Sequence, residues 1–172
     1  IRVLATPAMP APWPSTVPGT SIERDPHPYR GPAGVVRDVA QALPADRHVL
    51  VVEGARHLDA SLAPMIADHL ASGAAITVGR NPDRSPAGVY CIRRDALDAV
   101  PTAGFCDLKE QLLPRLRASG RLVLVHDLEG RGAMPLRTRL ELIEAARVAR
   151  HAAPPGGPVA IGRLPGPSAL RV

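Results

Sequence analysis

Residues 48–52, which read His-Val-Leu-Val-Val, form a continuous apolar run between Asp46 and Gly54. A strand with one face in water alternates apolar and polar residues, whereas a run without alternation is typical of a strand buried on both faces. Such strands belong mainly to parallel sheets that carry helices on both sides. The run therefore predicts a central strand of a layered α/β domain.

Patterns typical of helices and strands alternate along the rest of the chain. Two helices are expected on the faces of the sheet, one at 59–72 and one at 138–150, where Thr138 and Glu141 form a capping box. The other expected elements are a helix that ends near Pro44, a helix after Asp107, and strands at 1–5, 74–78, 87–92 and 122–125. This order predicts a three-layer α/β domain with a largely parallel sheet.

Proline content divides the 172 residues into segments. Eight prolines lie between Pro7 and Pro32, and because proline donates no backbone hydrogen bond, we expect an irregular loop there without a regular helix or central strand. Residues 152–172 are rich in proline and glycine and are expected to form a loosely structured tail. Residues 1–151 are then expected to form one domain, a usual size for a single core.

Charge and cysteine content narrow the classes of function. The net charge is +5, but all but one of the 21 basic residues are arginines spread along the chain without interleaved aromatic residues, so nucleic-acid binding is not expected. No apolar run reaches the ~18 residues that a membrane span requires. Cys91 and Cys106 form no disulfide or zinc motif, which fits a reducing compartment, and we expect a cytoplasmic location.

Six segments follow one another in an order that resembles the sugar-1-phosphate nucleotidyltransferases, also called nucleotide-sugar pyrophosphorylases. The most specific segment is Asp-Leu-Lys-Glu-Gln-Leu-Leu-Pro-Arg-Leu at 107–116. The others are RGPAGVVRD at 30–38, VLVVEGA at 49–55, HLASGAAIT at 69–77, AGVY at 87–90 and TRLELIEA at 138–145. The resemblance covers residues 30–146 and implies a Rossmann-like fold and a role in nucleotide-sugar metabolism, such as polysaccharide biosynthesis.

The same resemblance implies a catalytic site that this chain has only in part. Members of the family join a nucleoside triphosphate to a sugar-1-phosphate, using a Gly-rich loop with Arg and Lys after their first strand and Asp residues that hold Mg²⁺. This sequence lacks that strand and loop, and its one lysine, Lys109, belongs to the helix motif instead. One metal-binding Asp corresponds to Ala55 and the second to about Pro135. We therefore expect no catalytic residue, and Mg²⁺ only if activity remains.

A few positions match ligand-binding parts of the family. The nucleotide-binding candidates are Gly31, Ala33, Gly34 and Gly54, and the sugar-binding candidates are Ala87 and Gly88. The glycines near residue 31 also suit the turn before a helix, which is the alternative interpretation. Glu53, two residues before Ala55 on the same face of a strand, is a candidate for a relocated metal ligand. Asp59, beside His57, is a second candidate.

Two hypotheses about function follow, and a third is an alternative. In the first, a degenerate nucleotidyltransferase-like domain acts as a scaffold or as a sensor of a nucleotide or nucleotide sugar, alone or in a homo- or hetero-oligomer. In the second, the chain is part of an active NTP:sugar-1-phosphate nucleotidyltransferase whose signature loop is supplied elsewhere. Ala55 favours the first, because an added loop would not restore a carboxylate at that position. The third is a basic domain that binds acidic polymers.

Overall fold

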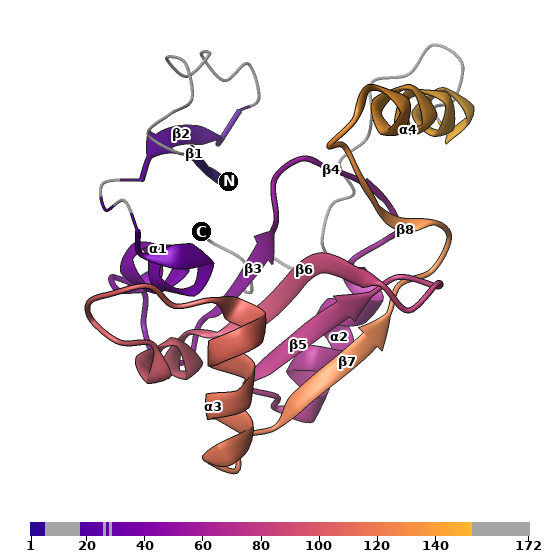
Figure 1. The fold of residues 1–172 in the computed structure, drawn as a ribbon. Helices are drawn as coiled ribbons and strands as arrows, with labels where there is room; N and C mark the ends of the chain where they lie inside the picture. Colours follow the sequence, from indigo (N-terminus) through magenta and orange to yellow (C-terminus); the bar gives the residue numbers. More distant parts are fainter. Residues whose placement is uncertain (6–17, 26, 28, 153–172) are drawn as a thin grey trace.

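The computed structural model describes residues 1–5, 18–25, 27 and 29–152, and it has a mixed α/β fold (Figure 1). Its largest unit is a four-stranded sheet in the order β3-β6-β5-β7. These strands are β3 (His48–Val52), β6 (Pro86–Arg93), β5 (Ile76–Arg80) and β7 (Val123–Asp127). The strands predicted at 48–52, 74–78 and 87–92 therefore lie in one sheet, as the apolar pattern indicates.

The sheet is mixed, so the prediction of a largely parallel sheet is wrong. β6 runs antiparallel to both of its neighbours, β3 and β5, and of the three strand pairs in the sheet only β5–β7 is parallel. The cause is the short turn at 81–85, which joins β5 and β6 as a hairpin. A parallel connection needs a longer crossover, usually a helix, and no room for one exists between these two strands.

β3 is an outer strand, so the prediction of a central position for residues 48–52 is wrong as well. It pairs with β6 from His48 opposite Arg93 to Val52 opposite Val89, and it pairs with no other described strand. Both of its faces are nevertheless covered by apolar side chains. A continuous apolar pattern indicates that both faces of a strand are buried. It does not indicate how many strands lie beside it in the sheet.

Helical segments cover both faces of the sheet. On one side lie α1 (Gly31–Ala40), a 3₁₀ segment (Arg94–Ala99), a π-helical turn (Leu108–Leu112) and α3 (Leu113–Ala118), whose apolar residues form a core with Tyr90 and Ile92. On the other lies α2 (Ala63–Ser72), whose Met65 packs with Val89 and Cys91. Because successive residues of β6 point to opposite faces, this one strand contributes to both cores.

Two small sheets complete the described structure. β1 (Arg2–Ala5) pairs in parallel with β2 (Ser21–Arg24), and β4 (Arg56–Asp59) pairs antiparallel with β8 (Gly132–Pro135). Since residues 56–59 form β4, α2 begins at Ala63 and not at 59 as predicted. α4 (Arg139–Ala152) packs against β8 and β4, so its predicted place on the main sheet is also wrong.

The proline-rich segment is partly regular, which corrects the prediction of an irregular loop over 7–32. β2 lies inside it, and α1 begins at Gly31 with Pro32 in its first turn. Proline is tolerated there because the first backbone N–H groups of a helix have no partner within the helix. The rest of that prediction, at 6–17, 26 and 28, lies outside the described residues, as does the expected tail from residue 153 onward.

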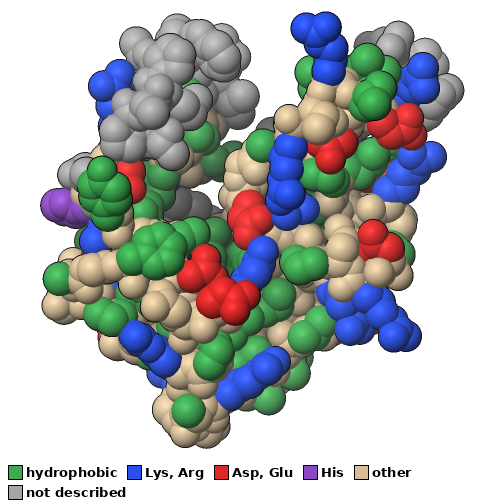
Figure 2. All heavy atoms as spheres, in the orientation of Figure 1, with side chains coloured by type: hydrophobic (Ala, Val, Ile, Leu, Met, Phe, Trp, Pro, Cys, Tyr) green, Lys and Arg blue, Asp and Glu red, His purple; other side chains and the backbone are tan. Residues whose placement is uncertain are grey.

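The surface of the described residues carries mixed charge. On the face drawn in Figure 2, Lys and Arg side chains are scattered among acidic and apolar ones and form no continuous basic band among the described residues. In the same part of the chain, no helix is both long enough and apolar enough to span a bilayer.

Candidate functional site

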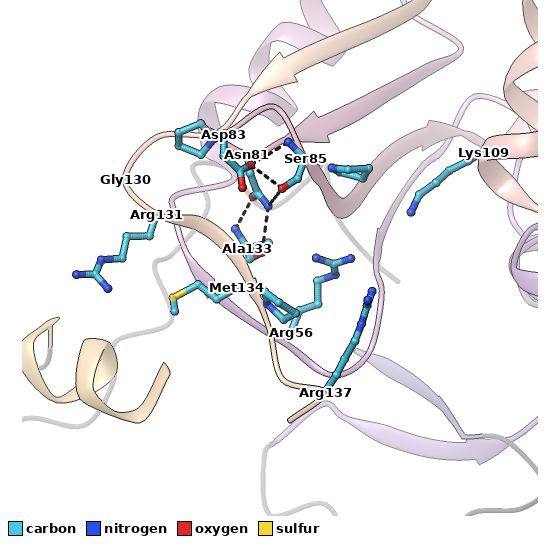
Figure 3. Close-up of a pocket in the computed structure, with 13 residues that line it drawn as sticks. Arg56, Asn81, Asp83, Ser85, Lys109, Gly130, Arg131, Ala133, Met134 and Arg137 are labelled. Atoms are coloured by element: carbon cyan, nitrogen blue, oxygen red, sulfur yellow. Dashed lines mark hydrogen bonds between the residues drawn. The ribbon is translucent and has the colours of Figure 1, made fainter. Parts of the chain in front are cut away.

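A pocket of about 590 Å³ opens where the β4–β8 sheet meets the turn between β5 and β6 (Figure 3). Its walls come from Arg56 of β4, from residues 81–86, from Lys109 of the π-helical turn, and from residues 130–137 around β8. Segments that are far apart in the sequence therefore meet here. The pocket lies at the end of β3 that leads into the predicted site residue Glu53.

Three cationic side chains, Arg56, Lys109 and Arg137, point into the same space in Figure 3. Arg56 and Lys109 share one carboxylate, because Glu53 lies 3.1 Å from each of them. The side chain of Arg137 makes no ion pair with any residue that the structure describes. Because Asp83 also lines the pocket, these three positive charges are set against two carboxylates, Glu53 and Asp83, which leaves a small excess of positive charge there.

Arg131 also lines the pocket but takes a different direction. In Figure 3 its guanidinium points away from the other three cations, and it donates to Glu144 of α4 at 3.0 Å. Its charge is therefore balanced by a carboxylate outside the pocket. Arg131 is a natural control for tests of Arg56, Lys109 and Arg137, the three cations that point into the pocket.

Glu53 accepts hydrogen bonds from donors on three other segments. Besides Arg56 and Lys109, the hydroxyl of Tyr90 donates to it at 3.0 Å. Burial by itself would raise the pKa of Glu53, but the hydrogen bond and charge of Lys109, with Tyr90 and Arg56, outweigh it and lower the pKa. Glu53 is therefore an ionised acceptor that positions cations.

Gly88, one of the predicted sugar-binding residues, lies directly against this ion pair. Its φ is +69°, and an added Cβ would lie 2.6 Å from Arg56 Nε and from a carboxylate oxygen of Glu53. Its carbonyl oxygen also accepts from the Glu53 N–H at 2.8 Å. Glycine is required here for the Glu53–Arg56 contact to form. The other candidate, Ala87, is fully buried in the apolar core with Met65.

The predicted nucleotide-binding residues near the start of α1 contact other parts of the chain. A Cβ on Gly31 would lie 2.6 Å from the carbonyl oxygen of Cys106, and the Ala33 N–H donates to that same oxygen at 3.0 Å. Gly34 packs against the side chain of Arg30. These contacts account for the small residues at the start of α1. Gly54, after β3, has open space around it.

The described residues do not fit a magnesium site. Mg²⁺ prefers several oxygen ligands in octahedral geometry. Glu53 is surrounded by donors. Asp59 and His57 lie on β4 opposite Gly132 and Met134 of β8, and neither Gly132 nor Met134 has a side-chain oxygen to offer. No group of three or more His, Cys, Asp or Glu residues in the described part of the chain is placed to hold a metal ion.

Asn81 fixes the wall of the pocket that faces β8. Its side-chain oxygen accepts from the Ala133 N–H at 2.8 Å, and its amide donates to the Ala133 carbonyl at 3.3 Å and to Ser85 Oγ at 3.0 Å. Ser85 in turn donates to Asp83 at 2.6 Å. This network ties the β5–β6 turn to β8 and so holds two walls of the pocket together.

Sequence reasoning singled out Glu53 and Gly88, assigned Lys109 to a helix motif without a role in a site, and missed Arg56, Arg137 and Asn81. Nothing in the local sequence separates Arg56 or Arg137 from the many other arginines of the chain. Asn81 was recognisable only as part of a turn. No protein-family model matches the chain, and no curated protein matches it. The function of the pocket is therefore inferred from its geometry and charge.

Proposed function

We propose that the chain is a nucleotidyltransferase-like domain that binds a phosphorylated sugar, free or within a nucleotide sugar, and acts as a sensor or scaffold. The observation that carries this proposal is the convergence of Arg56, Lys109 and Arg137 on one pocket. Arginine presents a planar fork of donors that matches phosphate oxygens, and lysine adds a compact charge. A phosphate group would offset the excess positive charge there.

The size of the pocket also supports a sugar phosphate. Small-molecule pockets commonly enclose ~300–1,000 Å³, and this one measures about 590 Å³. Asn81 and Ser85 line the wall opposite Lys109, where their side chains hold the wall in place through hydrogen bonds to each other, to Ala133 and to Asp83. The resemblance of residues 30–146 to sugar-1-phosphate nucleotidyltransferases names the same class of ligand.

Catalysis would need more than this pocket supplies. Transfer of a nucleotidyl group requires stabilisation of the charge that develops on the phosphates, and loss of one such group costs ~10²–10³ in rate. The sequence lacks the family's Gly-rich loop and has Ala55 in place of a metal-binding Asp. These losses need not multiply, because groups that act as a unit are strongly non-additive. We propose that the chain alone has little or no transferase activity.

A thermal-unfolding screen against sugar-1-phosphates, nucleotide sugars and nucleotides, each with and without Mg²⁺, tests this proposal. A ligand at ~100 times its Kd should stabilise the folded state by ~2.7 kcal/mol. The same sugars without phosphate should give no shift. Stabilisation by a polyanion such as heparin, without any by sugar phosphates, would contradict the proposal and favour a domain that binds acidic polymers.

A pyrophosphate-release assay with common triphosphates and sugar phosphates tests the lack of catalysis separately. We expect no signal above background. Mg²⁺-dependent turnover near ~1 s⁻¹, the low end for ordinary enzymes, would contradict an inactive domain. It would favour an active nucleotidyltransferase instead.

A further inference from the structure

The outer edge of β3 presents a row of backbone groups without partners among the described strands. On its inner side, Arg47 accepts from the Arg94 N–H at 2.7 Å and the Glu53 N–H donates to Gly88 at 2.8 Å. Hydrogen-bonded residues alternate along an antiparallel pair, so the odd-numbered residues from 47 to 53 bond toward β6. The N–H and C=O groups of the even-numbered residues, His48, Leu50 and Val52, therefore point outward.

This edge lacks the features that usually prevent strands from pairing. Proteins protect outer strands with charged residues, prolines or bulges. β7, the other outer strand of the sheet, ends in His126 and Asp127, and Asp127 is paired with Arg80. β3 has no Asp, Glu, Lys, Arg or Pro within 48–52, and Val52 is 41% exposed. The edge is apolar and regular in register, and no described residue of the chain makes backbone hydrogen bonds to it.

We propose that β3 of a second copy of this chain pairs antiparallel with this edge, around a two-fold axis at Leu50. In that register His48 faces Val52 of the second copy, and Leu50 faces its own counterpart. All three outward-pointing residues then exchange backbone hydrogen bonds with outward-pointing residues. If the pairing shifted by one residue, each residue with an outward-pointing N–H and C=O would face a residue whose groups bond to β6. Interchain hydrogen bonds could then not form, so the alternation along the strand favours the proposed register.

The charges that flank the strand complement each other in the same register. Arg47 comes to lie opposite Glu53 of the second copy, and the symmetry repeats this pair at the other end. Both are at non-hydrogen-bonded positions, where the side chains of opposed residues approach most closely. Arg47 is exposed and makes no ion pair with any described residue of its own chain. The second copy would place near this guanidinium the Glu53 carboxylate, which also pairs with Arg56 and Lys109 of that copy.

Sedimentation velocity over the micromolar range tests this proposal, and a reversible dimer is the expected result. Val52→Pro removes the outward N–H and leaves the hydrogen bonds to β6 in place. By symmetry two hydrogen bonds are lost, which should weaken the dimer about 30-fold. Val52→Thr, which keeps the N–H and the branched shape, is the matched control and should dimerise like the wild type.

Arg47→Glu provides a second test that does not disturb the strand. It places like charges opposite each other twice, so the dimer should weaken, and added salt should reduce the difference from the wild type. A wild-type protein that is monomeric at every concentration would overturn the proposal. A dimer that both Val52→Pro and Arg47→Glu leave unchanged would also overturn it, because it would use another surface. Neither substituted residue lines the pocket, so loss of dimerisation in these variants can be measured separately from ligand binding by the wild type.

Discussion

Lowering the pH from 7 to 4 should reduce the free energy of unfolding by about 3 kcal/mol through His69 alone. His69 is fully buried in α2, where its ring nitrogens lie 2.8 Å from His48 Nδ1 and 2.9 Å from Thr77 Oγ1. Burial, with the nearby His48 and Arg93, lowers the pKa of His69 from 6.5 to about 4. The pKa of His48 is also lowered, chiefly by burial.

The direction of the effect follows from which state binds the proton. The unfolded chain takes up a proton at His69 near pH 6.5, whereas the folded protein does so only near pH 4. The contribution of His69 to stability is therefore complete above pH 6.5 and is lost as the pH falls toward 4. Each unit of pKa shift corresponds to ~1.4 kcal/mol.

Urea unfolding at a series of pH values between 7 and 4 measures this loss. In His69→Gln, the free energy of unfolding should fall between pH 6.5 and 4 only by the amount that the other titratable groups contribute. His126→Gln is the comparison variant, because it removes a histidine ring that contacts the exposed Asp68 and lies outside the buried contacts of His69. An equally steep decline in His69→Gln would contradict the assignment.

Gly132→Ala should lower the free energy of unfolding by about 2–5 kcal/mol and disturb the wall of the pocket that Asn81 holds. Gly132 has a φ of +69°, which costs a residue with a Cβ ~1–2 kcal/mol. Its Cβ would also collide with the side-chain oxygen of Asn81, which is buried and accepts from the Ala133 N–H. Breaking a buried hydrogen bond of this kind adds ~1–3 kcal/mol.

Gly104→Ala separates the cost of a positive φ from the cost of breaking the Asn81 hydrogen bond. Gly104 has a similar φ of +82°, but a Cβ there would have open space around it. Urea unfolding should therefore show a loss of only ~1–2 kcal/mol for Gly104→Ala. Equal losses in the two variants would show that the Asn81 network adds nothing to stability.

The elements that sequence reasoning predicted well are those set by local patterns. The strands predicted at 48–52 and 87–92 form with nearly those bounds, and the one predicted at 74–78 forms two residues later, at 76–80. A strand of this kind is recognised by the burial of its own residues. Strand direction and order depend on connections and partners. Because the turn at 81–85 is short, β6 runs antiparallel to β5. The residues of β3 do not indicate that it lies at the edge of the sheet.

The candidate site was predictable only where a motif marked it. Glu53 and Gly88 stood out through their places on predicted strands, whereas Lys109 was assigned to a helix motif and not to a site. Arg56 and Arg137 come from segments about 80 residues apart and meet only because β4 pairs with β8. Such a meeting depends on tertiary structure, and arginines are too frequent in this chain to mark a site by themselves.

Calorimetric titration with the phosphorylated sugar that gives the largest thermal shift tests the central claim most directly. Arg137→Ala should weaken binding at least about tenfold, because a hydrogen bond to a charged group contributes ~1.5–3 kcal/mol. Arg131→Ala removes the same charge from the same pocket wall and should change Kd less than about twofold, because that side chain is engaged with Glu144. Equal losses in the two variants, or no binding of any phosphorylated sugar to the wild type, would contradict the account.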